Sequence, residues 1–250
     1  MTNTIKVLDK GVVILRNISG PTRRVYTANT TENEQSLCPA RAFDADDTDV
    51  ANAARMSFNQ TDSGRTYEQE MKLTEYLIKN QHSTPLESIV VWLEYKLPIF
   101  VARQFHRHRT QSINEISGRY VTLEPDWYIP EIVGGKAKDK KQGQEDNLSA
   151  EVQARFKQAL SNACQADYDQ YLHYMEQGVA PEHARMLLHT NHYTRYMSTM
   201  NLRNLLGFLL LRDHEHAQVE AQAYAKAITQ LLEPHLPGIM SLYRTYMRGD

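Results

Sequence analysis

The clearest alternation of hydrophobic and polar residues lies in IVVWLEYKLP, residues 89–98. Every second residue there is apolar, and a period of two predicts a strand with one buried face. Pro98 suits the first position of a helix, because its missing N–H would have no partner there. We therefore expect a helix over 99–109. The inward residues of the strand would be Val91, Leu93, Tyr95 and Leu97.

Apolar residues at intervals of three and four predict further helices. One covers 65–81, and another covers 149–177 and ends at Gly178, a common helix-stop residue. The first helix would bury Tyr67, Met71, Thr74 and Ile78. The second would bury Val152, Phe156, Ala159, Ala163, Leu172 and Met175. Other helices are expected over 47–56, 180–188, 201–211, 216–233 and a short C-terminal stretch, and extended segments over 6–15, 121–129 and 192–200.

This order contains more helix than strand and no regular alternation of strand and helix. It indicates a single mixed domain of the α+β class, with an antiparallel or mixed sheet. Residues 1–46 are polar and rich in threonine, so we assign them to an N-terminal extension of the main domain, 47–250. Residues 131–148 have few apolar positions and predict an exposed, mobile loop.

The composition argues against nucleic acid and membranes as general binding partners. The chain has 250 residues, with 28 basic and 30 acidic side chains and a formal charge of −2. A general nucleic-acid or membrane-surface binder normally carries a clear basic excess. The longest apolar run, 205–211, is far shorter than the roughly 18 residues of a membrane span. Cys38 and Cys164 have no CxxC spacing, and no signal peptide is recognisable, so a reducing, cytoplasmic location fits.

The stretch QFHRHRTQSINEISGRY, residues 104–120, concentrates the charge. The arginines alone could simply stabilise a helix C-terminus. A metal site is disfavoured, because the pair His106 and His108 is flanked by arginines, and neither it nor the pair His214 and His216 belongs to a zinc-binding motif. Nucleic acid is also disfavoured, because few aromatic residues are interleaved with the basic ones.

The residues that follow the arginines favour a nucleotide. Ser117 and Gly118 can supply backbone N–H donors, and arginine side chains together with backbone amides suit phosphate groups. Arg107 and Arg109 cannot share one helical face, so they could reach two different anions. Glu115 could accept a hydrogen bond from a ribose hydroxyl or from an arginine. These residues predict a site for one or two nucleotides.

RHRTQSINEISGRY also resembles the Arg-His-Arg-x7-Ser signature of the flavin-dependent thymidylate synthases, with Arg107, His108, Arg109 and Ser117 at the signature positions. The resemblance continues in HSTPLESI, in EHARMLL and in YTRYMSTMNLRNLLGFLLLRDHEHAQVE. It covers the chain from about Asp47 to the C-terminus and is weakest over 131–150.

The resemblance implies an enzyme that methylates dUMP to dTMP. The carbon donor would be 5,10-methylenetetrahydrofolate, and the hydride would come from reduced FAD, which NADPH regenerates. Members of the family form homotetramers whose four active sites are each shared between chains. They need no cysteine nucleophile, and neither cysteine here has a site-like context. The competing interpretation is a non-catalytic nucleotide-binding protein on the same fold.

The resemblance also implies residue roles. The FAD contacts would be Ser57, Thr84, Glu87, Arg107, His108, Arg109, Glu115, Asn201 and His216. The dUMP contacts would be Gln104, Arg107, Glu115, Ser117, Gly118, Arg119, Arg185 and Arg212. Arg212 would be the catalytic residue that activates the uracil ring, while His82 and Tyr120 would be folate or nicotinamide contacts. Ser117 lacks an identifiable base, so we assign it to binding rather than to nucleophilic attack.

Several of these residues have ordinary structural alternatives. Arg185 and Arg212 could form salt bridges, and Asn201 could cap the following helix. Ser57 could hydrogen-bond its own backbone. Gly207 departs from the family pattern, in which we expect an asparagine that helps to hold the adenine of FAD.

Overall fold

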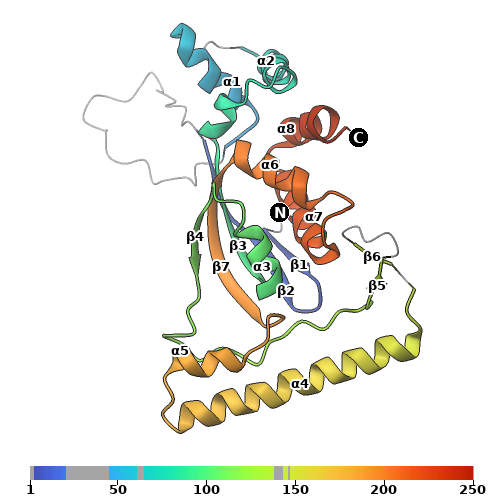
Figure 1. The fold of residues 1–250 in the computed structure, drawn as a ribbon. Coiled ribbons are helices and arrows are strands. Elements are labelled where there is room, and N and C mark those ends of the chain that lie inside the picture. Colours follow the sequence, from blue (N-terminus) through green and yellow to red (C-terminus); the bar gives the residue numbers. More distant parts are fainter. Residues whose placement is uncertain (1–2, 21–44, 61–64, 138–142, 146, 250) are drawn as a thin grey trace.

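A five-stranded antiparallel sheet forms the centre of the computed structural model, which describes residues 3–20, 45–60, 65–137, 143–145 and 147–249 (Figure 1). The predicted α+β class is confirmed. The strands, in their order across the sheet, are β1 (Thr4–Val7), β2 (Gly11–Ser19), β3 (Val90–Pro98), β7 (Tyr193–Asn201) and β4 (Ser112–Glu115).

Strand β3 has the predicted alternation. Val91, Leu93, Tyr95 and Leu97 are each at most 2% exposed, and the residues between them are half-buried. The extended segment predicted over 192–200 is confirmed as strand β7, which pairs with β3 along its whole length. This long pairing fixes the two elements that lead into the charged stretch and into the Arg212 helix.

The single strand predicted over 6–15 is wrong, because the chain turns back on itself there. Residues 8–10 form a turn between β1 and β2, and Leu8 has a φ of 59°. The Asp9 carboxylate accepts the backbone N–H of Lys10 at 2.9 Å, a local bond that favours the turn. Two strands of the sheet thus come from the segment assigned to the N-terminal extension; its expected arm, at 21–44, lies outside the described residues.

Helices α3 (Ile99–Phe105), α6 (Leu202–Arg212) and α7 (Val219–Leu232) pack against one face of the sheet (Figure 1). The Phe105 ring lies 4.8 Å from that of Phe208 and 5.9 Å from that of Tyr95. Helix α3 ends four residues earlier than the predicted 109, so Arg107, His108 and Arg109 lie in the turn that follows it. On the opposite face of the sheet, Glu94 pairs with Arg16 and Arg195.

Short helices cover the upper end of the sheet: α1 (Thr48–Arg55), η1 (Met56–Phe58), α2 (Tyr67–Lys79), η2 (Thr84–Ser88), α8 (Pro237–Leu242) and the π-helix Tyr243–Arg248 (Figure 1). The predicted buried face of α2 is only partly correct. Thr74 and Ile78 are buried, but Tyr67 is 50% exposed and Glu70 takes an inward position instead. Glu70 is drawn inward because its carboxylate pairs with Arg55 of α1.

The long helix α4 (Ala150–Glu176) crosses the foot of the sheet, followed by α5 (Pro181–Ala184) and η3 (Arg185–Leu187) (Figure 1). Gly178, at φ 82°, follows its end as predicted. The predicted burial of Val152, Phe156 and Ala159 is wrong, since all three are exposed, the first two at 48% each. The N-terminal half of α4 projects beyond the sheet, and only its later turns bury Cys164, Tyr168 and Tyr171.

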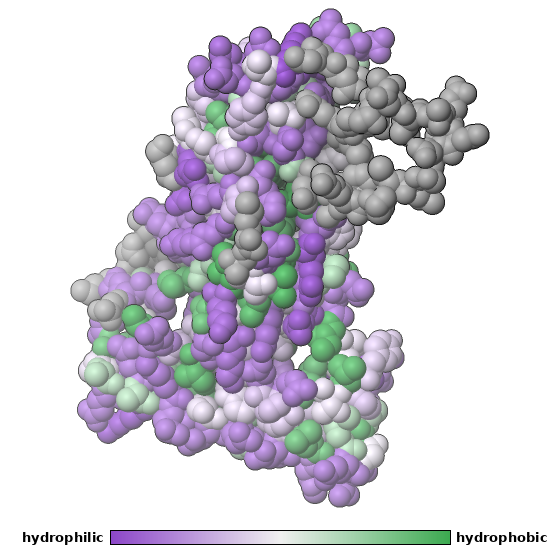
Figure 2. All heavy atoms as spheres, turned by 180° about the vertical axis from the view of Figure 1, so that it is seen from behind, coloured by the Kyte–Doolittle hydropathy of each residue, from purple (hydrophilic) through white to green (hydrophobic). Residues whose placement is uncertain are grey.

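The described parts of 131–148 include two short paired strands, β5 (Gly135–Lys136) and β6 (Gln144–Glu145), so this stretch is not a plain loop. From behind, the surface is mostly hydrophilic, and its hydrophobic groups gather over the middle and foot of the molecule (Figure 2). No helix among the described residues is long and apolar enough to cross a membrane.

Candidate functional site

The turn after α3 carries Arg107, His108 and Arg109, and Gln111 fixes its shape. The Gln111 amide donates to the carbonyl oxygens of Phe105, at 2.7 Å, and of His108, at 3.0 Å. Its own oxygen accepts the Ser198 hydroxyl of β7 at 2.7 Å. The turn is therefore tied both to the end of α3 and to the sheet.

Arg212, in the last turn of α6, reaches this turn directly. Its Nε donates to His108 Nε2 at 2.9 Å, and its Nη2 donates to the carbonyl oxygen of Gln104 at 3.0 Å. Burial, together with the nearby Arg212 charge, lowers the pKa of His108 to about 4. His108 is therefore neutral at pH 7 and can accept this hydrogen bond, which orients the guanidinium group of Arg212.

A cavity of about 750 Å³ opens beside Arg212. Burial and the neighbouring Arg107 lower the pKa of Arg212, although an arginine remains charged at neutral pH. Two guanidinium groups next to one cavity form a strongly anion-attracting site. Its lining consists of Gln104, Arg107, Gly143, Gln144, Arg212, Glu215, His216, Ala217, Gln218 and Val219.

A second cavity, of about 230 Å³, lies where β4 leads into the following loop. Gly118 packs closely against Arg185 and Leu123 there. A Cβ on Gly118 would lie 3.4 Å from Arg185 Cδ and 3.1 Å from Leu123 Cδ1. Glu115 accepts a hydrogen bond from the Thr194 hydroxyl at 2.5 Å. The lining residues are Ile99, Glu115, Ile116, Ser117, Gly118, Leu123, Arg185, Leu188, His192, Tyr193 and Thr194.

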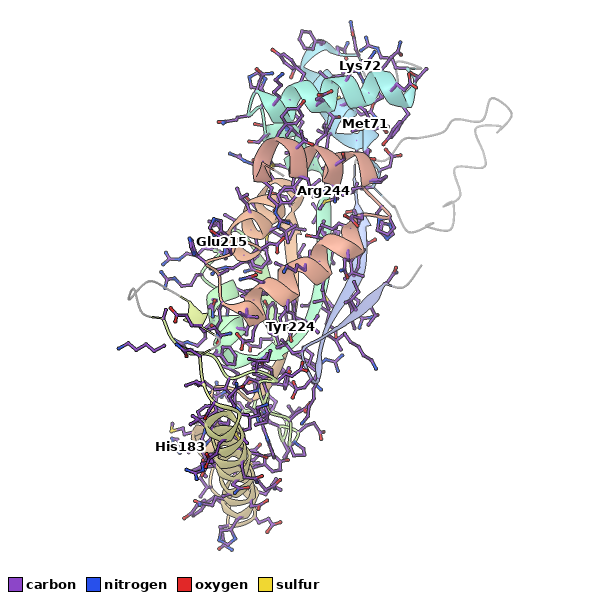
Figure 3. The ribbon with its side chains drawn as sticks, turned by 90° about the vertical axis from the view of Figure 1, so that its right-hand side faces the viewer. Met71, Lys72, His183, Glu215, Tyr224 and Arg244 are labelled. Carbon is purple, nitrogen blue, oxygen red and sulfur yellow. The ribbon has the colours of Figure 1, made fainter. Side chains whose placement is uncertain are left out.

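Seven of the eight predicted dUMP residues divide into two groups within one chain, whereas the eighth, Arg119, lines neither cavity and pairs with Glu182 at 3.0 Å. Gln104, Arg107 and Arg212 line the first cavity, whereas Glu115, Ser117, Gly118 and Arg185 line the second. The two cavities are separated along the long axis of the molecule. Figure 3 shows Glu215, from the first cavity, at mid-height beside α6 and α7, and His183, two residues before Arg185, at the foot.

Four arginines of the candidate site have no acidic partner within the described residues. Of the 14 arginines in the described part of the chain, eight form ion pairs with carboxylates. Arg107, Arg109, Arg185 and Arg212 are among the six that do not. The salt-bridge alternative for Arg185 and Arg212 is therefore wrong within the described residues, and these cations remain available to an anionic ligand.

The family model described as thymidylate synthase complementing protein matches residues 41–238. A flavin-dependent thymidylate synthase of Thermus thermophilus is 37% identical over 234 residues, which are 94% of this chain and 76% of that protein. This chain belongs to the flavin-dependent thymidylate synthase family. Its relative of the same name in Thermotoga neapolitana is 35% identical, over 98% of this chain and 97% of that protein.

A solved structure shows the same fold. The UMP/dUMP methylase PolB of Streptomyces cacaoi, bound to 5-Br dUMP, superposes with a TM-score of 0.78. The superposition covers 98% of this chain and 99% of PolB, at 24% sequence identity. PolB and this chain therefore share a fold.

Three of the remaining predicted FAD residues lie on the upper helices, and the fourth, Asn201, ends β7. Ser57 is in η1, and Thr84 and Glu87 are in η2. Glu87 pairs with Arg203 of α6, and Asn201 caps the same helix by accepting the Asn204 N–H at 2.9 Å. Asn201 is thus a helix cap, as its alternative interpretation states, and its role toward FAD stays a prediction. The chain alone does not bring this group together with the turn at 107–109 through any hydrogen bond between described residues.

His82, Tyr120 and Gly207 lie in three different surroundings. The His82 ring lies 6.0 Å from the Tyr76 ring. Tyr120 is 81% exposed, with the Arg119 guanidinium 5.9 Å from its ring. A Cβ on Gly207 would meet no atom within 4 Å, so the helix surface is open there. A larger residue would fit, and the glycine leaves that space to solvent or to a ligand.

Several lining residues carry no signal in the sequence. Gln218 accepts a hydrogen bond from the Gln104 amide, and Leu123 packs against Gly118. Gln218 directly precedes α7, a position at which a polar residue normally indicates only a helix start. Leu123 follows the motif by only a few residues, but an isolated leucine in an irregular segment gives no signal of its own.

Two smaller predictions concern metal and cysteine. The described residues contain no group of three histidine, cysteine or acidic side chains arranged to hold a metal ion. Cys164 is 4% exposed, and burial raises the pKa of its thiol. Its sulfur contacts the side-chain oxygen of Asn191 at 3.5 Å. Cys38 lies outside the described residues.

Proposed function

We propose that this protein methylates dUMP to dTMP, taking the methylene group from 5,10-methylenetetrahydrofolate and the hydride from reduced FAD, with NADPH as the reductant of the flavin. The observation that carries the proposal is a set of four arginines that have no acidic partner among the described residues. They lie at the signature turn and at the two cavities of a chain that belongs to this family. Phosphate groups on dUMP and FAD are suitable anions for them.

The division of the dUMP residues supports an assembly of several chains. One small nucleotide would have to reach both Arg185 and Arg212, which line separate cavities. A second subunit that places its own Ser117 and Arg185 opposite the first cavity would complete the site. We therefore propose that the protein is a homotetramer whose active sites are shared between chains. We also propose that it is located in the cytoplasm.

The chain's side chains fit a flavin in chemical type. Bound FAD would supply the hydride. Arg107 and Arg109 would bind its phosphates, His108 would contact it, and Ser57, Thr84, Glu87, Glu115, Asn201 and His216 complete the proposed set. The open space beside Gly207 belongs to the surface on which we expect the adenine of FAD to bind.

Arg212 is the proposed catalytic residue. A preorganised cation near the uracil ring stabilises negative charge that develops on it during reaction. The hydrogen bonds to His108 and Gln104 hold the guanidinium group in place before substrate arrives. A cysteine nucleophile is not needed, and the buried, protonated Cys164 has no access to either cavity's lining.

A visible spectrum tests this function first. We expect the purified protein to be yellow and to bleach under NADPH without oxygen, faster when dUMP is present. Formation of dTMP after addition of methylenetetrahydrofolate would complete the evidence. A protein that takes up no FAD would refute the proposal. Flavin and dUMP binding without dTMP formation would instead favour the non-catalytic nucleotide-binding protein.

We expect Arg107→Ala to weaken binding of dUMP and FAD at least tenfold, about 1.4 kcal/mol. The physical reason is the loss of a cation that lines the first cavity and has no acidic partner in the described chain. Isothermal titration with each ligand measures the effect. Arg103→Ala is the matched control, because Arg103 is an exposed arginine of α3 that lines neither cavity. Unchanged affinities in Arg107→Ala would remove this residue from the site.

A further inference from the structure

The loop over residues 116–123 carries Ser117 and Gly118 but has almost no regular structure of its own. Its backbone turns at 117–121, where the Tyr120 N–H donates to the Ser117 carbonyl at 3.0 Å. Such a loop cannot hold two backbone donors at a fixed place unless other elements support it. The support comes from α4, a helix to which none of the predicted site residues belongs.

Two tyrosines of α4 bind the backbone of one loop residue, Leu123. The Tyr168 hydroxyl donates to the Leu123 carbonyl oxygen at 2.9 Å, and the Leu123 N–H donates to the Tyr171 hydroxyl at 3.1 Å. The tyrosines are three residues apart, so they lie on one face of the helix. One hydroxyl acts as donor and the other as acceptor, and together they satisfy both peptide groups of Leu123.

Both hydroxyls are held rigidly. Tyr171 is fully buried and Tyr168 is 7% exposed, and their rings lie 5.7 Å apart. They belong to a separate hydrophobic cluster that includes Ala184 of α5 and Trp127. A buried ring has few alternative rotamers, so the position of each hydroxyl is set by packing.

The position of Leu123 in turn affects the shape of the second cavity. Its side chain lines the cavity, and its Cδ1 would lie 3.1 Å from a Cβ on Gly118. The unit of α4, α5 and η3 contacts the loop at two further points: Glu182 pairs with Arg119 at 3.0 Å, and Arg185 packs against Gly118. Figure 3 shows His183 of α5 beside α4 at the foot of the molecule. One helical unit thus supplies Arg185 and also positions the loop that faces it.

We infer that Tyr168 and Tyr171 are positioning residues for nucleotide binding, which hold the 116–123 loop through the backbone of Leu123 so that the Ser117 and Gly118 amides face Arg185. The inference rests on the proposed function, because it takes the second cavity to be part of the dUMP site. Neither tyrosine contacts the nucleotide. Their hydroxyls act through the loop, while their rings serve the hydrophobic cluster.

Phenylalanine substitutions separate these two roles, since they keep the ring and remove only the hydroxyl. We expect the double variant Tyr168→Phe/Tyr171→Phe to raise the dUMP dissociation constant about tenfold, the effect of losing two hydrogen bonds of ordinary net strength. Each single variant should show roughly a threefold effect. The KM for dUMP should rise in parallel, with kcat, the FAD dissociation constant and NADPH oxidation without dUMP nearly unchanged.

Titration of the FAD-loaded protein with dUMP gives the readout, and steady-state dTMP formation gives the split between KM and kcat. Tyr174→Phe is the matched control, because Tyr174 lies on the same helix, is 44% exposed and makes no side-chain hydrogen bond within the described part of the chain. It should behave like the unaltered protein.

The outcomes are distinct. Unaltered protein that binds dUMP, with a double variant of equal affinity, overturns the inference and leaves the proposed function intact. An equal loss of FAD and dUMP affinity with a lowered melting temperature would show a purely structural role and also overturn it. Unaltered protein that binds no dUMP would refute the proposed function itself.

Discussion

Replacing Arg212 with alanine is expected to lower the rate of dTMP formation about 100-fold or more while FAD stays bound, because removing one preorganised donor from a charge-stabilising site costs that much. Two hydrogen bonds fix the position of Arg212 before any ligand arrives. Its Nε donates to neutral His108 and its Nη2 to the Gln104 carbonyl oxygen. The rate under saturating dUMP and folate, with the flavin spectrum as a check on loading, gives the measurement.

Arg244→Ala supplies the control for this variant. Arg244 pairs with Glu233 and lies among the upper helices, apart from Glu215 of the first cavity (Figure 3). We expect its rate to stay within about twofold, because an exposed ion pair contributes little. Near-normal dTMP formation by Arg212→Ala would take Arg212 out of the chemistry. A colourless Arg212→Ala protein would show that the residue mainly organises the flavin site.

The largest effect on stability is expected from Glu70→Gln. Arg55 and Glu70 form an ion pair between α1 and α2, and they are 4% and 1% exposed. Arg55 Nε and Glu70 Oε1 have no protein hydrogen-bond partner within the described chain. Removing one charge leaves the other buried and uncompensated, and we expect the free energy of unfolding to fall by about 3–5 kcal/mol. Urea denaturation at fixed protein and FAD concentrations measures this change.

Two further variants separate burial from pairing. Arg55→Met/Glu70→Met replaces both charges with apolar groups, and its stability should return close to that of the unaltered protein. Glu151→Gln breaks an exposed pair with Arg155 and should cost at most about 1 kcal/mol. Similar losses in Glu70→Gln and Glu151→Gln would show that burial of the first pair has no special energetic effect.

The Arg55–Glu70 pair also bears on the flavin site. Arg55 is the last residue of α1, and η1 follows it at once with the exposed Met56 and Phe58 around Ser57. Ser57 is a proposed FAD contact whose turn begins at a buried charge. Any loss of FAD affinity in Glu70→Gln would therefore follow from displacement of this turn rather than from a lost direct contact.

Local sequence determined the elements whose signal is repeated along the chain. The alternation in β3 and the extended segment that forms β7 were predictable, because period-two patterning survives when one face of a sheet is buried, whereas the pairing of the two strands came from the structure. Ser149 and Gly178 marked the ends of α4, because capping depends on neighbouring backbone groups alone. The signature around Arg107 identified the family, since a linear motif can be read without a structure.

Tertiary structure decided the features that depend on distant partners. The sequence favoured a helix through Arg109, but α3 stops at Phe105, where packing against Phe208 and bonds from Gln111 turn the chain toward β4. Glu70 is buried because Arg55 of another helix meets it. Helical periodicity cannot reveal either event.

The candidate site shows the same division. Residue types named from the motif were enough to predict an anion site, because arginines and backbone amides recognise phosphates wherever they converge. Only the fold showed that Arg212 is oriented by His108, that Arg185 faces Gly118 in a separate cavity, and that Tyr168 and Tyr171 hold Leu123. Sequence specifies which chemical groups are present, whereas long-range packing decides which of them meet and at what distance.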